Sequence, residues 1–184
     1  MNFIKKNIFY LILIAVFAAI AFVPELKLKI RDLFFPVAEI ENAVTIPEND
    51  FDIELKGINV PDNNLKNLKK DRLLFLNFWG TWCPPCREEW PTIQKLYDSR
   101  KNEMDFVLIA MQDKEEDIRE FLKKNNYSVP VYIAQSPISD KLLPKVFPTT
   151  FLLNQDGRIL LKEDASKDWN SKSVHDFIDN LTKH

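Results

Sequence analysis

Apolar and polar residues alternate along this chain in blocks whose lengths predict strands and helices. Short apolar runs bounded by turn-forming residues favour buried strands, and longer stretches with charges on one side favour amphipathic helices. Strands are predicted over residues 51–55, 72–78, 105–111, 129–134, 149–153 and 158–163. Helices are predicted over residues 84–101, with an interruption at Pro91, and over 115–125 and 168–183. A loop or helical turn is predicted at 64–70 and a helical turn at 139–143.

The order of these elements predicts the fold class. Strands that alternate with helices indicate an α/β architecture in which helices flank a mixed central sheet. A strand after Gly57 is expected to pair with residues 51–55 and to form an N-terminal hairpin extension. Residues 154–157 read Asn-Gln-Asp-Gly, which is typical of a hairpin turn, and are expected to join the last two strands.

The N-terminal segment has the pattern of a membrane anchor or a signal peptide. Lys5 and Lys6 precede an almost purely apolar run over residues 8–23. The run is shorter than the roughly 20 residues that a membrane span needs, and Ala19-Ile20-Ala21 is a candidate cleavage site. We favour an uncleaved anchor within residues 1–23. Either alternative predicts an exported, periplasmic domain, which the anchor would attach to the inner membrane.

The remaining chain divides into a linker and one domain. Residues 24–48 mix apolar and charged positions, which fits either a tether or a segment lying along the bilayer surface. Residues 49–184 carry the alternating elements and form the predicted domain. A length of 184 residues with 46% hydrophobic content is consistent with one globular unit plus an appendage. The net charge of −2, without a basic stripe, argues against a nucleic-acid partner.

The two cysteines of the chain, Cys83 and Cys86, stand at the start of the helix predicted over 84–101. Side chains at this spacing lie on one side of the first helical turn, close enough to form a disulfide. The unpartnered N–H groups at the helix start stabilise a thiolate, which is the reactive form of cysteine. We expect Cys83 to be the exposed attacking thiol, and Cys86 to be the more covered thiol that resolves a mixed disulfide.

Other uses of a cysteine pair are less well supported. A structural zinc site needs about four ligands, and the chain adds only His175 and His184, far from the pair. Haem attachment requires histidine directly after the second cysteine, where Arg87 stands. A Cu(I)-binding module remains as an alternative, although no methionine or histidine lies near the motif. We expect no metal and no cofactor besides the redox-active disulfide.

Pro84 and Pro85 bear on the direction of the redox reaction. Neither proline has an N–H to donate to the Cys83 thiolate, and no lysine or histidine separates the cysteines. We therefore expect only a moderately lowered pKa for Cys83. A less stabilised thiolate favours a reductant over a strong oxidant, with a disulfide oxidase or isomerase as the alternative.

Two segments carry a resemblance to a known family. Residues 76–91 read LNFWGTWCPPCREEWP, and residues 146–157 read VFPTTFLLNQDG. Both resemble the thioredoxin-like superfamily, and in particular its membrane-anchored TlpA/ResA-like thiol-disulfide oxidoreductases, over roughly residues 49–184. The resemblance implies a thioredoxin-like fold and an enzyme that reduces disulfides of exported proteins, often apocytochrome c before haem attachment. It also implies a thiol electron donor in the membrane.

The resemblance adds further site residues. Glu89 matches an acidic position of ResA-like proteins and is expected to join Cys83 and Cys86 as a catalytic residue, accepting the Cys86 proton through water. The alternative is a solvated surface glutamate. Asn77 stands where thioredoxin has a buried aspartate, and it cannot titrate.

A substrate groove is implied on the other side of the pair. Pro148 matches the cis-proline of the superfamily, which lets the preceding residue offer its backbone to an extended peptide. That residue is Phe147, where the family usually has a smaller side chain. Trp82, Pro84 and Pro85 complete the expected substrate-binding set, with Trp82 at the border of the groove.

Overall fold

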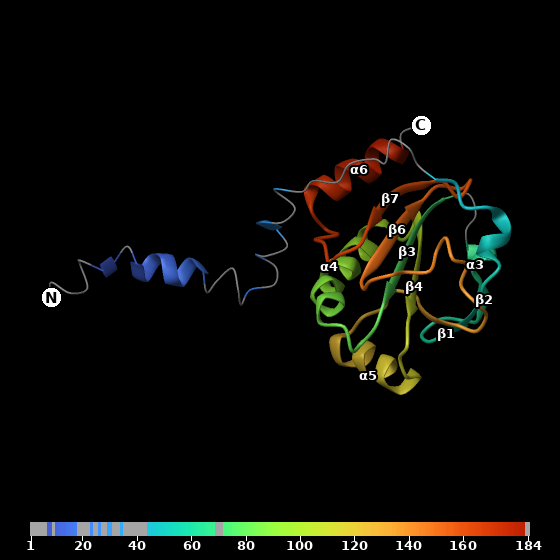
Figure 1. Cartoon of the computed structure of the whole chain (residues 1–184), viewed down its shortest axis with the longest axis horizontal. Coiled ribbons are helices and arrows are strands. Elements are labelled where there is room, and N and C mark those ends of the chain that lie inside the picture. Colours follow the sequence, from blue (N-terminus) through green and yellow to red (C-terminus); the bar gives the residue numbers. More distant parts are fainter. Residues whose placement is uncertain are drawn as a thin grey trace.

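A seven-stranded mixed sheet is the centre of the computed structural model, which describes residues 7–8, 10–17, 23, 26, 29–30, 34, 44–68 and 72–182 (Figure 1). In spatial order its strands are β2 (Asn63–Asn64), β1 (Glu54–Gly57), β5 (Val131–Ala134), β4 (Met104–Ala110), β3 (Leu73–Trp79), β6 (Thr149–Leu153) and β7 (Ile159–Glu163). The β3–β4 and β4–β5 pairs are parallel, and the other neighbours are antiparallel. The mixed α/β fold is therefore confirmed.

Helices cover both faces of this sheet. The structure contains η1 (Glu48–Phe51), α3 (Leu65–Leu68), α4 (Pro84–Arg100), α5 (Glu115–Asn125) and α6 (Lys172–Thr182). In Figure 1, α4 and α3 lie on opposite sides of the sheet. One core contains buried residues of α4, α5 and α6, and the other contains residues of η1, α3 and the N-terminal hairpin.

Strand β3 contributes to both cores because its side chains alternate between the two faces. Phe75 and Trp79 belong to the core that α4 covers, whereas Leu76 and Phe78 belong to the core beneath α3. A strand buried on both faces is expected to be apolar nearly throughout, which is the composition of β3. Asn77 shares the face of Phe75 and Trp79, so its polar side chain is directed toward α4.

Trp90 of α4 lies in an aromatic cluster within this core. Its ring centroid is 4.6 Å from that of Trp79 and 5.0 Å from that of Tyr127, with Phe121 at 5.4 Å. Burial in this cluster raises the pKa of Tyr127. Within the described part of the chain, the buried Nε1 groups of Trp79 and Trp90 have no hydrogen-bond partner. The cluster therefore contributes apolar packing rather than polar contacts.

Three sequence-based expectations about the helices and strands differ most from the structure. The helix does not stop at Pro91, and α4 runs through it; a proline removes one hydrogen bond, but the buried neighbours Trp90 and Thr92 hold the helix in place on both sides. Strand β1 begins later than predicted because residues 48–51 form the 3-10 turn η1. Helix α6 begins at Lys172, because Asp168 accepts a hydrogen bond from the Asn170 N–H and closes a turn.

The N-terminal hairpin is confirmed, and it is part of the main sheet. Strand β1 pairs with β2 on one side and with β5 on the other. The hairpin predicted at residues 154–157 is also present: Gly157 has a positive φ of 78° and its N–H donates to the Asn154 carbonyl. An ideal Cβ at Gly157 would lie 2.7 Å from the Ile46 carbonyl oxygen, so this turn requires glycine.

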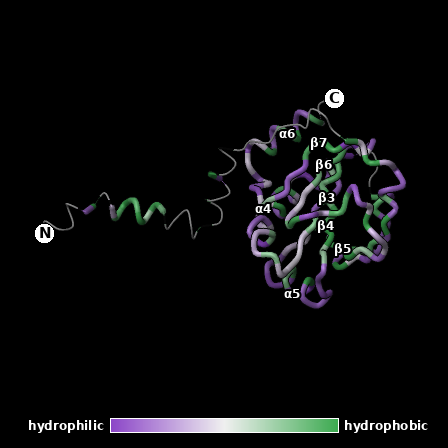
Figure 2. Tube along the Cα trace, in the orientation of Figure 1, coloured by the Kyte–Doolittle hydropathy of each residue, from purple (hydrophilic) through white to green (hydrophobic). Residues whose placement is uncertain are grey.

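Residues 10–17 near the N-terminus are helical, and their side chains are exposed. The segment is hydrophobic (Figure 2). Among the residues that the structure describes, no helix combines the length and apolar character needed to cross a membrane. Ala19-Ile20-Ala21 and most of residues 24–43 lie outside the described residues, so the anchor and the linker stay predictions.

Candidate active site

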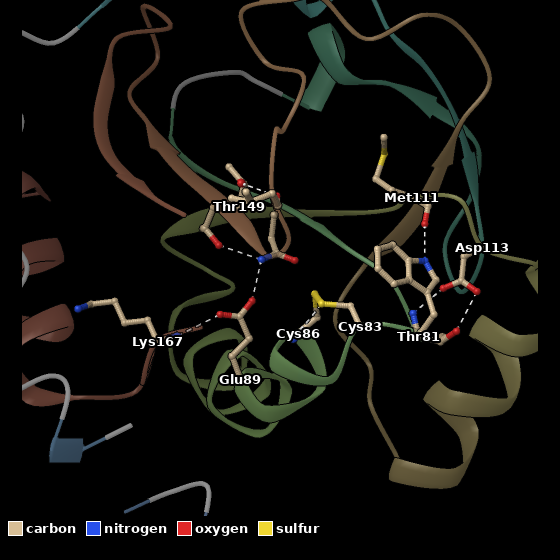
Figure 3. Close-up of a disulfide and its surroundings, with 12 residues drawn as sticks. Thr81, Cys83, Cys86, Glu89, Met111, Asp113, Thr149 and Lys167 are labelled. Carbon is tan, nitrogen blue, oxygen red and sulfur yellow. Dashed lines mark hydrogen bonds between the residues drawn. A yellow bond between two sulfur atoms is a disulfide. The ribbon is translucent and has the colours of Figure 1, made fainter. Parts of the chain in front are cut away.

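The Cys83–Cys86 pair forms a disulfide where β3 passes into α4 (Figure 3). The sulfur atoms are 2.11 Å apart and the Cα atoms 5.3 Å apart. Cys83 is the N-cap residue of α4, and its Sγ accepts a hydrogen bond of 3.3 Å from the Cys86 N–H. Pro84 and Pro85 occupy the first two helical positions, where a missing N–H interrupts no intrahelical bond. The sequence thus places one sulfur at the positive end of the helix dipole.

A tight turn connects β3 to this disulfide. The Cys83 N–H donates to the Gly80 carbonyl at 3.1 Å. An ideal Cβ on Gly80 would lie 2.4 Å from Nε1 of Trp82, so the indole ring takes the space that a side chain would need. Glycine at this position lets Trp82 fold back over the turn that leads into the disulfide.

The two cysteines differ little in accessible surface. Cys83 is 3% exposed and Cys86 is fully buried. The expectation of an exposed first thiol is therefore wrong for the disulfide form. Both residues belong to the core on the α4 side of the sheet. What distinguishes them is position: Cys83 caps the helix, and Cys86 lies inside its first turn.

Glu89 lies one turn after Cys86 on α4 and is fully buried (Figure 3). Its Oε1 accepts a hydrogen bond of 3.0 Å from Nδ2 of Asn77. Its Oε2 accepts bonds from the Lys167 backbone N–H at 3.2 Å and from Nε1 of Trp169 at 2.9 Å. A solvated surface glutamate is thus excluded. The carboxyl group instead belongs to a buried polar network that begins next to the disulfide.

Asn77 connects this network to the neighbouring strand. Its Nδ2 also donates to Oγ1 of Thr150 at 2.8 Å, in keeping with the register that pairs Asn77 with Thr150. Its Oδ1 is buried and has no hydrogen-bond partner among the described residues. The amide therefore uses its donors to hold Glu89 and Thr150.

Trp82 and Phe147 form the exposed side of the site. Trp82 is 48% exposed, and its ring meets that of Phe147 nearly edge-on, with centroids 5.4 Å apart at 82°. The Phe147–Pro148 peptide bond is cis, as the resemblance implies. Pro148 is buried, whereas Pro84 and Pro85 are exposed beside the disulfide. The expected groove residues therefore come from two segments, and the aromatic contact joins those segments.

Asp113 is a site residue that the sequence reasoning missed (Figure 3). Its carboxylate accepts hydrogen bonds from the Thr81 N–H at 2.6 Å and from Oγ1 of Thr81 at 2.8 Å. Nearby, Nε1 of Trp82 donates to the Met111 carbonyl at 3.0 Å. The loop after β4 thus holds the two residues that precede Cys83. An aspartate just before a helix suggests a cap, but nothing local in the sequence points to Thr81.

Among the residues that the structure describes, no cluster of three or more histidine, cysteine, aspartate or glutamate side chains could hold a metal ion.

The chain is similar to thioredoxin-like proteins in sequence and in fold. A family model described as thioredoxin-like matches residues 71–159. The thiol-disulfide oxidoreductase ResA of Bacillus thuringiensis subsp. konkukian is 31% identical over 134 residues, which cover 71% of this chain and 72% of that protein. ResA of Bacillus subtilis is 29% identical over 128 residues, covering 66% and 70%.

Solved structures extend this similarity. The crystal structure of StoA from Bacillus subtilis matches with a TM-score of 0.52 and 27% identity, covering 61% of this chain and 86% of that one. A thiol:disulfide interchange protein from Bacteroides matches with a TM-score of 0.61 and 20% identity, covering 76% and 91%. The second match shows a shared fold.

The contacts of Asp113 lead to a stability prediction. Asp113→Ala removes the acceptor of two Thr81 hydrogen bonds and should lower the free energy of unfolding by about 1.5–3 kcal/mol. Equilibrium urea unfolding of the disulfide form, followed by tryptophan fluorescence, measures this change. Glu120→Ala is the control, because this side chain is exposed on α5 and should change stability by less than about 0.5 kcal/mol. Equal stability of the two variants would contradict a structural role for Asp113.

Proposed function

The chain belongs to the thioredoxin-like family as a ResA-type thiol-disulfide oxidoreductase, and from this premise we propose that it works as a reductase of disulfides in exported proteins. One observation supports reduction, and not oxidation, of the client. Cys83 caps α4, and the two residues that follow it are prolines without an N–H. Of the first three helical residues, only Cys86 has an N–H to offer the Cys83 sulfur, at 3.3 Å. A thiolate with few donors is moderately stabilised, which favours electron donation.

The proposed reaction proceeds in two exchanges. The Cys83 thiolate attacks one sulfur of the client disulfide, and the other client sulfur leaves as a thiolate. Cys86 then loses its proton and attacks Sγ of Cys83, which releases the second client thiolate and forms the Cys83–Cys86 disulfide. The client gains two electrons and the protein loses two. A thiol electron donor in the membrane is proposed to return the protein to its reduced form.

Glu89 is proposed as the acceptor of the Cys86 proton, through a water molecule. The support is its place one turn along α4, its burial and its network of N–H donors. A buried carboxylate next to a buried thiol can accept a proton without direct exchange with bulk solvent.

Clients are proposed to bind along Trp82, Pro84, Pro85, Phe147 and Pro148. The exposed Trp82 ring and the exposed prolines offer apolar contact area beside the disulfide. Phe147 is bulkier than the residue that the family usually has at this position, and its ring contacts that of Trp82. Apocytochrome c is the client that the family resemblance suggests, and it is our proposal for this chain.

We also propose that residues 1–23 anchor the protein in the inner membrane, with the redox domain on the extracytoplasmic, periplasmic side. The support is the pair Lys5 and Lys6, the apolar run that follows them, and the exposed hydrophobic helix over residues 10–17.

Trapping of mixed disulfides tests the roles of the two cysteines. Cys86→Ala should stop the reaction after the first exchange and accumulate adducts with clients, because no other thiol remains to resolve them. Cys83→Ala should trap almost nothing, since its remaining thiol lies inside the helix turn. Each variant is expressed in the native cell, and adducts are separated without reductant and identified by mass spectrometry.

The double variant Cys83→Ala/Cys86→Ala gives the background of this trapping experiment. Apocytochrome c or a haem-attachment protein among the adducts would support a role in cytochrome maturation. Equal trapping by both single variants would reverse the assignment of nucleophile and resolver. An absence of adducts from either would favour the Cu(I)-binding alternative.

The redox potential tests the direction of the reaction. We expect a potential below about −200 mV, on the reducing side of protein disulfide isomerase. Pro85→Ala restores an N–H at the second helical position, which can donate to an N-cap side chain, and should raise the potential. Pro84→Ala restores an N–H at the first position and should change it less. Equilibration with glutathione measures all three proteins, and a parent value near about −120 mV would contradict the reductase proposal.

Membrane topology tests the location. A reporter that is active only outside the cytoplasm, fused after His184, should be active and should remain in the membrane fraction. Deletion of residues 1–23 should leave the same reporter inactive. A soluble product that lacks its first 21 residues would instead indicate cleavage after Ala19-Ile20-Ala21.

A further inference from the structure

The loop between β7 and α6 supplies two of the hydrogen-bond donors of Glu89. Both donate to Oε2: the Lys167 backbone N–H at 3.2 Å and Nε1 of Trp169 at 2.9 Å. Glu89 and Trp169 are separated by 80 positions in sequence. The Trp169 side chain therefore makes a specific polar contact with a residue of the redox helix, in addition to its apolar packing.

The Trp169 ring is held from several sides. It is 1% exposed, and it meets the Phe75 ring edge-on, with centroids 4.9 Å apart at 87°. Its backbone N–H donates to Oγ1 of Thr92 at 3.1 Å, and Oγ1 of Thr92 also contacts the Lys167 carbonyl at 3.3 Å. Because Thr92 and Glu89 lie on the same helix, the loop and the carboxylate are fixed relative to each other.

The chemistry of the indole donor determines how this contact affects Glu89. An indole N–H donates a hydrogen bond and cannot accept one. A donor of this kind favours the charged form of the carboxylate that it contacts. It also orients the group, since Oε2 takes both bonds from the loop and Oε1 takes the bond from Asn77.

The charged groups around Glu89 come from the same loop and from β7. The ammonium end of Lys167 points away from Glu89 (Figure 3), and its Nζ lies 4.0 Å from Glu163. Asp168 accepts a hydrogen bond from the Asn170 N–H. Asn77, on β3, is neutral, and Cys86 is the titratable neighbour one turn earlier on α4.

We propose that Trp169 is a positioning residue for Glu89, whose indole N–H holds the carboxylate in the orientation that takes the proton from Cys86 during resolution. The inference rests on the proposed role of Glu89. It assigns to the loop before α6 a part in the second exchange and none in the first attack by Cys83.

A two-phase thiol assay tests this assignment. The reduced full-length chain, kept in mild detergent, reacts with 5,5′-dithiobis(2-nitrobenzoate). The attack by Cys83 releases one coloured thiolate, and the attack by Cys86 on the resulting mixed disulfide releases a second. Stopped-flow absorbance from pH 5 to 9 separates the two phases. The first phase reports the nucleophile, and the second reports resolution.

Three variants give the expected pattern. Trp169→Phe keeps an aromatic ring and removes the N–H donor, so the midpoint of the second-phase pH profile should move up by about one pH unit. The first phase should stay unchanged. Glu89→Gln should slow the second phase by about 100-fold and move its midpoint further up, because the Cys86 thiol loses its proton acceptor. In the Glu89→Gln background, Trp169→Phe should add no further change, because its effect passes through the carboxylate.

Trp90→Phe is the matched control. It makes the same substitution at an equally buried tryptophan of the same core, whose Nε1 has no partner within the described residues. It should leave the second-phase midpoint in place. Thr92→Val is a second route should Trp169→Phe fold poorly: it removes the acceptor of the Trp169 backbone N–H and should shift the midpoint in the same direction.

The outcomes separate this inference from the proposed function. A normal midpoint in both Trp169→Phe and Thr92→Val, with a defect in Glu89→Gln, would overturn the role of Trp169 and leave that of Glu89 intact. A shift that persists in the Glu89→Gln background would show that Trp169 acts by another route, and would also overturn the inference. An unchanged profile in Glu89→Gln would remove the proposed role of Glu89 and the inference with it.

Discussion

The buried carboxyl group of Glu89 is the constraint on which the rest of this structure depends. A carboxylate removed from water costs several kcal/mol unless hydrogen bonds replace its solvation. Here the donors come from β3, through Asn77, and from the loop before α6, through Lys167 and Trp169. The first helix after the disulfide, the central strand and the C-terminal part of the chain must therefore be in place together. The same hydrogen bonds fix the position of the Glu89 carboxyl group beside Cys86.

The site consequently has two sides with different chemistry. On the outer side, Trp82 and the two prolines are exposed beside the disulfide. On the inner side, Cys86 is enclosed with Glu89 and the core of α4. In the proposed mechanism, the attack on a client takes place on the outer side, and the proton of the second thiol leaves on the inner side. One helix turn connects the two sides, because the cysteines are only three positions apart in the sequence.

Local patterns in the sequence were sufficient to predict the fold class and the reactive cysteine pair. The apolar run of β3, the cysteine spacing at a helix start and the turn at Gly157 are each determined by a few neighbouring residues. The bounds of α5 and β6 were predicted to the residue. Pro91 misled the helix prediction because the core on either side, and not the local backbone, decides whether a helix continues.

The other features of the site could not be predicted, because they depend on contacts between residues that are distant in the sequence. Glu89 and Trp169 are 80 residues apart and Thr81 and Asp113 are 32 apart, and no local pattern connects either pair. The burial of Cys83 likewise follows from tertiary packing. The span of the Glu89 network also has a consequence for synthesis. A growing chain can supply two of the donors of this carboxyl group only after residues 167–169 have been synthesised. The polar surroundings of Cys86 are therefore completed only late in synthesis, by the C-terminal part of the chain.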